Sequence, residues 1–77
     1  MFKGTLLSSP VEIDLKITAI DGGQNLNVKL RQVGLFIGDQ LQVLRLAPLG
    51  GPVLIESNGR EIALGRGLAA NITVEAV

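Results

Sequence analysis

The sequence predicts a small all-β domain that closes as a β-barrel of about five short strands, with one short helix and one helical turn. Three observations support this. Apolar and polar residues alternate along much of the chain, glycines and prolines separate the alternating runs, and an Asn58-Gly59 pair lies between two of them. A chain of 77 residues has room for one core, so residues 1–77 are expected to form a single domain.

The first strand is predicted over Val11–Ala19, where apolar and polar residues alternate without a break. Asp21–Asn25 interrupts this pattern, and Asn25 is the residue expected to cap a following helix. The helix is short, and its apolar residues fall on one stripe: Leu26, Leu30 and Val33.

The end of this helix is predicted at Gly34, because glycine readily adopts the left-handed conformation of a helix C-cap. Leu35 is then placed to pack back on Leu30, as in a Schellman motif. The next residues, Phe36–Asp39, are typical of a turn in which Gly38 adopts a positive φ.

A second strand is predicted over Gln40–Leu46, with a bulge or burial on both faces where its apolar phase switches between Val43 and Leu44. The following segment, Ala47–Pro52, cannot continue a strand because two prolines flank two glycines. It is expected to form a loop with Leu49 at its tip.

Two further strands, Val53–Ser57 and Arg60–Leu64, flank Asn58-Gly59, which predicts a hairpin with a type I′ turn. This register places Val53 opposite Leu64, Ile55 opposite Ile62 and Glu56 opposite Glu61. Gly65–Ala70 is expected to contain a single helical turn, and Ile72–Ala76 to form the closing strand.

Composition excludes several classes of function. There is no cysteine or histidine, so disulfides, thiolate or imidazole metal ligands and the commonest general base are excluded. Seven acidic and seven basic residues give zero net charge, and Phe2 and Phe36 are the only aromatic residues. Binding to nucleic acid is therefore not expected. Nothing predicts catalysis or a cofactor, and we expect a protein that is not an enzyme.

The apolar content, 47%, is high for so short a chain, so some apolar surface is expected to meet another protein, with self-association one alternative. No apolar run approaches the roughly 20 residues that span a bilayer, so direct membrane insertion is not expected. The first ten residues carry too short an apolar core for a secretory signal, and we expect a cytoplasmic protein.

Several short motifs follow one another in a characteristic order and spacing: Lys29-Leu30, Val33-Gly34-Leu35, Ile37-Gly38, Leu46–Pro52, Ile62-Ala63-Leu64 and Ile72-Thr73-Val74. Together they resemble the FeoA family. The chain departs from the family pattern at three positions: Ile37 replaces a usual proline, Gly51 a usual aspartate and Gly65 a usual arginine.

This resemblance implies an SH3-like β-barrel that serves ferrous iron uptake beside the membrane transporter FeoB, on its cytoplasmic side. The same type of domain forms the C-terminal module of metal-dependent repressors of the DtxR kind, so a free-standing regulatory module is the alternative. The residues expected to bind a partner are Leu35, Pro48, Leu49, Gly50 and Pro52. Leu49 is either a plug for one end of the barrel or an exposed anchor, and the sequence leaves both open.

Two charged groups invite other interpretations. Glu56 and Glu61, predicted side by side, could hold a divalent cation, although a solvated pair is the simpler interpretation. Three basic residues could bind phosphate or headgroups, but they are few among an equal number of acids: Lys29, Arg31 and Arg45. We therefore predict no metal site and no nucleic-acid site.

Overall fold

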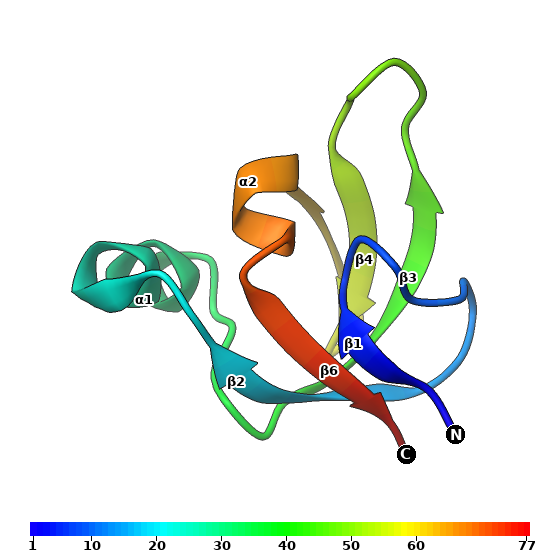
Figure 1. Ribbon diagram of the computed structural model, residues 1–77, viewed down its shortest axis with the longest axis horizontal. Coiled ribbons are helices and arrows are strands. Elements are labelled where there is room, and N and C mark those ends of the chain that lie inside the picture. Colours follow the sequence, from blue (N-terminus) through cyan, green and yellow to red (C-terminus); the bar gives the residue numbers. More distant parts are fainter.

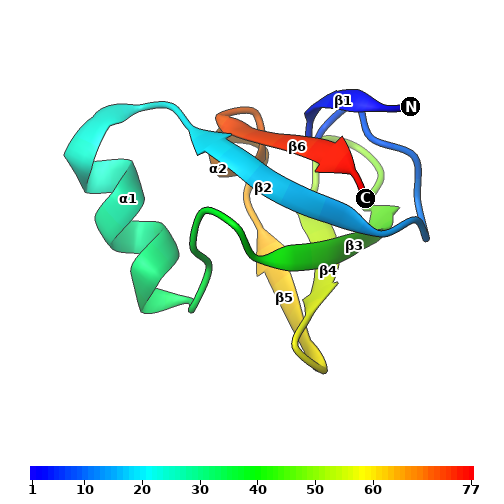
Figure 2. The ribbon, with the colours of Figure 1, turned by 90° about the horizontal axis from the view of Figure 1, so that it is seen from below.

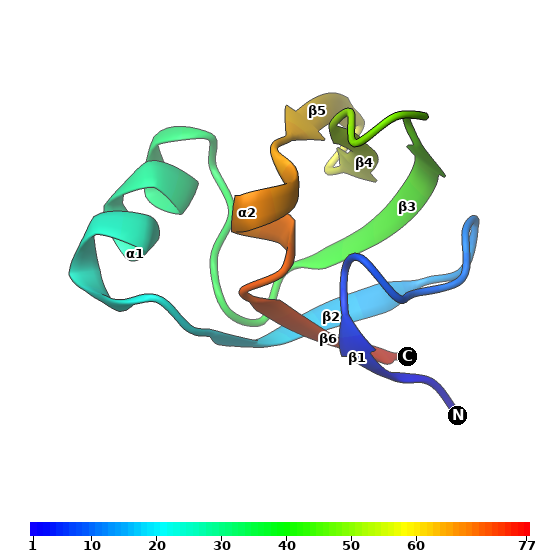
Figure 3. The ribbon, with the colours of Figure 1, turned by 45° about the horizontal axis from the view of Figure 1, so that its top comes forward.

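Six antiparallel strands and two short helices make up the computed structural model, which describes all residues 1–77 (Figure 1). The elements are β1 (Lys3–Thr5), β2 (Leu15–Ile20), α1 (Gly23–Gln32), β3 (Gln40–Leu46), β4 (Val53–Ser57), β5 (Arg60–Leu64), α2 (Arg66–Ala69) and β6 (Ile72–Ala76). The strand order is β1-β6-β2-β3-β4-β5, so β1 and β5 are free edges. The sheet curls around the core like a barrel but stays open (Figure 3).

The N-terminal part differs from the sequence-based prediction. Strand β1 (Lys3–Thr5) was not predicted, and it pairs with β6. The first predicted strand begins at Leu15 instead of Val11, because Glu12 adopts a φ of 61° that no extended strand allows. The amide of Glu12 still donates to the Val43 carbonyl at 2.8 Å, so the segment before β2 lies along β3 without extending its ladder.

Helix α1 begins after Gly22, whose φ is 116°, and no side chain caps its first turn. The prediction that Asn25 is the cap was wrong, since Asn25 lies inside the helix. The helix start therefore depends on the glycine pair at 22–23, which lets the chain turn sharply out of β2.

The C-terminal end of α1 confirms the predicted Schellman motif. Gly34 has a φ of 85°, and its amide donates to the Arg31 carbonyl at 3.0 Å. The Leu35 amide donates to the Leu30 carbonyl at 2.9 Å. Both leucine side chains are buried, so this cap also ties α1 to the core.

The predicted register of the β4–β5 hairpin is confirmed. The β3–β4 pairing shifts between Val43 and Arg45, which agrees with the bulge, the first of the two alternatives that the sequence left open. The hairpin turn has φ values of 53° at Asn58 and 76° at Gly59, as a type I′ turn requires. The cross-strand pairs are those predicted: Val53 with Leu64, Ile55 with Ile62, and Glu56 with Glu61.

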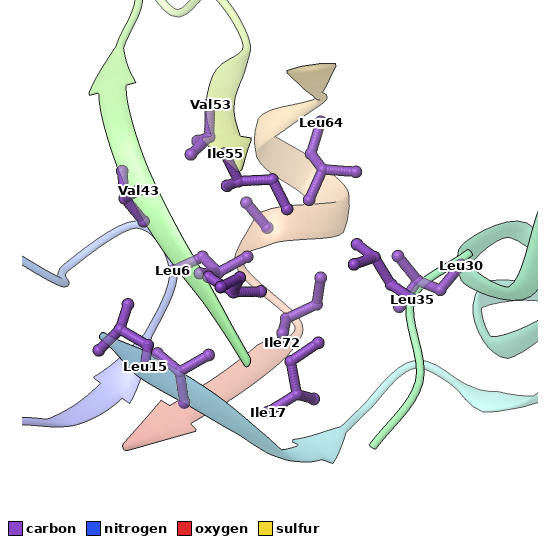
Figure 4. Packing of buried hydrophobic residues seen from close by; sticks show 13 residues of the cluster. Leu6, Leu15, Ile17, Leu30, Leu35, Val43, Val53, Ile55, Leu64 and Ile72 are labelled. Atoms are coloured by element: carbon purple, nitrogen blue, oxygen red, sulfur yellow. The ribbon is translucent and has the colours of Figure 1, made fainter. Parts of the chain in front are cut away.

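The core is one cluster of 13 buried apolar residues, shown in Figure 4. Each fully buried aliphatic side chain contributes roughly 1.5–3 kcal/mol relative to its exposed state. Leu6, which follows β1, lies in the middle of this cluster among side chains from the strands. Burial of Leu6 favours formation of β1, which was not predicted. The pairing of β1 with β6 directs the chain so that Leu6 enters the core.

Two protrusions leave the barrel on different sides. Helix α1 stands at one side, and the loop between β3 and β4 projects at the other (Figures 1 and 3). The two chain ends lie near each other beside β1 and β6 (Figure 2). Neither helix has the length and apolar content needed to cross a membrane.

Candidate protein–protein interaction site

The loop between β3 and β4, residues 47–52, holds Leu49 out into solvent. Leu49 and Gly50 have φ values of 59° and 75°, and the Gly51 amide donates to the Pro48 carbonyl at 3.1 Å, which closes a tight turn. The left-handed conformation costs a leucine roughly 1–2 kcal/mol. Its side chain is 104% exposed, so Leu49 is not the plug of the barrel.

The base of this loop is fixed from three directions. The Ala47 amide donates to the Pro52 carbonyl at 3.0 Å, and the Arg66 Nη2 atom donates to the Ala47 carbonyl at 3.2 Å. A Cβ atom added to Gly51 would lie 2.7 Å from the Ala47 Cβ, so the two arms of the loop are in close contact. The loop is therefore preorganised, with little freedom to lose when it binds.

Four of the five residues predicted to bind a partner lie together in this loop, and all four are exposed: Pro48, Leu49, Gly50 and Pro52. The fifth, Leu35, is elsewhere and is only 1% exposed. Its side chain is held in the core by the Schellman motif at the end of α1, so it lies apart from the loop. The site around Leu49 therefore consists of the loop without Leu35.

The charged groups have structural explanations. Glu56 and Glu61 are cross-strand neighbours on the exposed side of the hairpin, and no third carboxylate joins them, since no group of three or more potential metal-ligating residues exists. Calcium-like cations take six or more oxygen ligands, and two carboxylates supply far fewer.

The basic residues Lys29 and Arg31 lie in the last turn of α1, where positive charge interacts favourably with the helix dipole.

The sequence-based site missed a second exposed apolar segment. The turn between α1 and β3 was predicted, but its side chains were not considered as a surface. Phe36 is 49% exposed and Ile37 is 62% exposed. Two consecutive large apolar residues within a turn are the signal that could have revealed this surface, because turn positions are usually at the surface.

Comparison with known proteins identifies the family. The family model described as the FeoA domain matches residues 5–76, which is nearly the whole chain. The chain belongs to the FeoA family. A relative from Methanocaldococcus jannaschii, named putative Fe(2+) transport protein A, is 42% identical over 59 residues, which cover 77% of this chain and 70% of the relative.

Solved structures agree with this assignment. A crystal structure of the iron uptake regulatory protein FeoA has a TM-score of 0.86 and 30% identity, with all of both chains covered. The apo form of the manganese-activated repressor ScaR has a TM-score of 0.88 and 24% identity, and the match covers 96% of the FeoA-family chain and 35% of the repressor. The second likeness concerns the fold alone. The predicted all-β, SH3-like fold is thus confirmed, with the difference that the sheet remains open.

Proposed function

We propose that this FeoA-family chain is a non-enzymatic accessory protein of ferrous iron transport that contacts the cytoplasmic side of the membrane transporter FeoB. Its family, and the name of its relative from M. jannaschii, support a role in Fe²⁺ transport. The observation that carries the proposed contact is Leu49, fully exposed at the tip of a preorganised turn. An apolar side chain in such a position suits insertion into a pocket of another protein.

Contact with a transporter fits the residues of this chain better than tight binding of the metal. Ferrous iron sites in proteins commonly use imidazole or thiolate ligands, and the chain has no histidine or cysteine. The carboxylates that remain are spread over the surface and form no group of three. The iron-related role therefore depends on recognition of another protein.

Leu49 could supply a large part of the binding free energy. Complete burial of a leucine side chain is worth roughly 1.5–3 kcal/mol, which corresponds to about a tenfold to hundredfold change in affinity. Because Pro48, Pro52 and the hydrogen bonds at the loop base already fix the backbone, little of this gain is lost to ordering.

The test replaces Leu49 by aspartate and measures binding to the purified cytoplasmic domain of FeoB. We expect affinity to fall at least about tenfold, because a carboxylate cannot enter an apolar pocket without desolvation. Thermal stability should not fall, since aspartate tolerates the left-handed conformation better than leucine. Val11→Asp, at an apolar position that is half-exposed and lies outside the loop, is the control and should bind normally. Unchanged binding by folded L49D protein would show that the loop is not the contact.

The alternative is a free-standing regulatory module, which we keep as second candidate because the chain shares its fold, and only its fold, with a domain of the repressor ScaR. Pull-down of a DNA-binding repressor, without FeoB, would support this alternative. Self-association is a third outcome, since β1 and β5 are free edges. Light scattering at low and high protein concentration would detect it.

A further inference from the structure

A hollow lies between α1 and the turn that follows it. Its volume is about 320 Å³, and four apolar residues and two polar ones line it. They are Ile20 at the end of β2, Leu35, Phe36 and Ile37 before β3, and Asn27 and Arg31 on α1. We call these six residues the α1 pocket. A phenyl ring or a branched aliphatic side chain would fit within this volume.

The apolar wall of the α1 pocket is rigid. The Phe36 amide donates to Asp39 Oδ2 at 3.0 Å, and the Asp39 amide donates to the Phe36 carbonyl at 3.0 Å. The turn is also joined to β2, because the Gly38 amide donates to the Ile17 carbonyl at 2.8 Å and the Ile17 amide donates to the Asp39 carbonyl at 2.9 Å. These bonds hold Phe36 and Ile37 at the surface instead of letting them fold into the core.

The charge of the α1 pocket is positive. Arg31 is its only charged residue, and Asn27, four positions earlier, lies on the same face of α1. Helix α1 contains no acidic residue. The nearest acids in sequence do not line the pocket, and the carboxylate of Asp39 already accepts the Phe36 amide. A ligand that enters here therefore meets an apolar wall and one cationic side chain.

We infer that the α1 pocket is a docking site for a partner segment that presents a bulky apolar side chain beside a carboxylate. The apolar side chain fills the hollow against Ile20, Phe36 and Ile37, and the carboxylate pairs with Arg31 at its edge. This inference does not depend on the proposed role of Leu49, because the β3–β4 loop projects from another side of the molecule (Figures 1 and 3).

A purely structural role explains this surface less well. The positive charge of Arg31, near the C-terminal end of α1, interacts favourably with the helix dipole. That interaction does not require two large apolar residues to be exposed to solvent. Burying Phe36 or Ile37 would stabilise the fold, yet the hydrogen bonds of the turn hold both side chains about half or more exposed. An apolar patch that is fixed in place beside a hollow is typical of an interaction site.

The test uses a small probe with the same chemistry, 3-phenylpropionate, and follows the protein by two-dimensional NMR during titration. We expect chemical-shift changes at the side-chain amide of Asn27 and the methyl groups of Ile20 and Ile37. The neutral 3-phenylpropionamide should bind about threefold more weakly, since an exposed ion pair contributes modestly, and 3-phenylpropylamine should bind more weakly still.

Two variants and a control make the result decisive. Arg31→Gln should make the acid and the amide bind equally, while Ile37→Ser should weaken both probes. Arg45→Gln, which removes an exposed charge from β3, should change neither. Equal binding of acid and amide to the unmodified chain, shifts that map outside the α1 pocket, or no binding of 3-phenylpropionate would each overturn the inference. None of these outcomes bears on FeoB binding by Leu49, so the two proposals fail separately.

Discussion

Two turns of this chain expose apolar side chains, and they do so in different ways. The β3–β4 loop presents one residue, Leu49, at a convex tip. The turn between α1 and β3 presents Phe36 and Ile37 beside a hollow. A convex tip can only enter a pocket of its partner, whereas the second turn can also receive a side chain. Under the two proposals above, this one small domain has both an inserting surface and a receiving surface.

The two turns are also fixed by different chemistry. The β3–β4 loop depends on close contact of its arms, Ala47 against Gly51, and on the guanidinium of Arg66. The other turn depends on one carboxylate, that of Asp39, and on backbone bonds to β2. Single substitutions should therefore loosen one surface and leave the other intact.

The largest effect is expected for Gly51→Ala. Its Cβ would meet the Ala47 Cβ at 2.7 Å and the Pro48 carbonyl oxygen at 3.2 Å, so the loop must shift at a cost of roughly 1–3 kcal/mol. Urea unfolding measures this loss. Gly65→Ala is the control, because no atom lies within 4 Å of its added Cβ and its φ is −60°. Equal stability of the two variants would mean that the loop arms are not in tight contact.

A smaller loss, about 1 kcal/mol, is expected for Asp39→Ala, which removes the carboxylate that accepts the Phe36 amide. Faster hydrogen exchange at Phe36, measured by NMR, should accompany it, while exchange at Gly51 in the other turn stays unchanged. Asp14→Ala is the matched control, since this exposed carboxylate bonds only a side chain, that of Gln42. If exchange at Phe36 were unaltered, the side chain of Asp39 would not be what fixes the turn.

Much of the fold could be predicted from the sequence because local signals agreed with the tertiary structure. Asn58-Gly59 determines the hairpin register, and Gly34 with Leu35 determines the end of α1. Strand β1 could not be predicted, since three residues carry no periodicity and form a strand only by pairing with β6, about 70 positions away. The start of β2 was misplaced because the alternation continues through Glu12, where the backbone turns.

The candidate site was predictable only in part. The prolines and glycines of residues 47–52 indicated a loop, but whether Leu49 points inward depended on what else fills the barrel. Leu6 lies in the core, from a segment that the sequence left unassigned. The α1 pocket was unpredictable for a similar reason, because Ile20 and Arg31 come together only through the angle at which α1 leaves β2.

The smallest effect is expected for Leu49→Asn, which should stabilise the chain by about 0.5–1 kcal/mol. Asparagine adopts the left-handed conformation more readily than leucine, and the exposed leucine side chain contributes no burial to offset its strain. Thermal unfolding measures the gain. Leu49→Ala, which keeps a Cβ but lacks a polar group, should give little or none.

Leu49→Asn, compared with Ile37→Asn, also distinguishes strain from recognition. If Leu49 is retained for binding, Leu49→Asn should be more stable than the unmodified chain and should bind FeoB more weakly, so that stability and affinity change in opposite directions. No comparable trade-off is expected at Ile37, whose backbone is not in the left-handed region, so Ile37→Asn should leave stability nearly unchanged. A loss of stability in Leu49→Asn would mean that the leucine makes contacts within its own chain that outweigh the strain of its left-handed backbone.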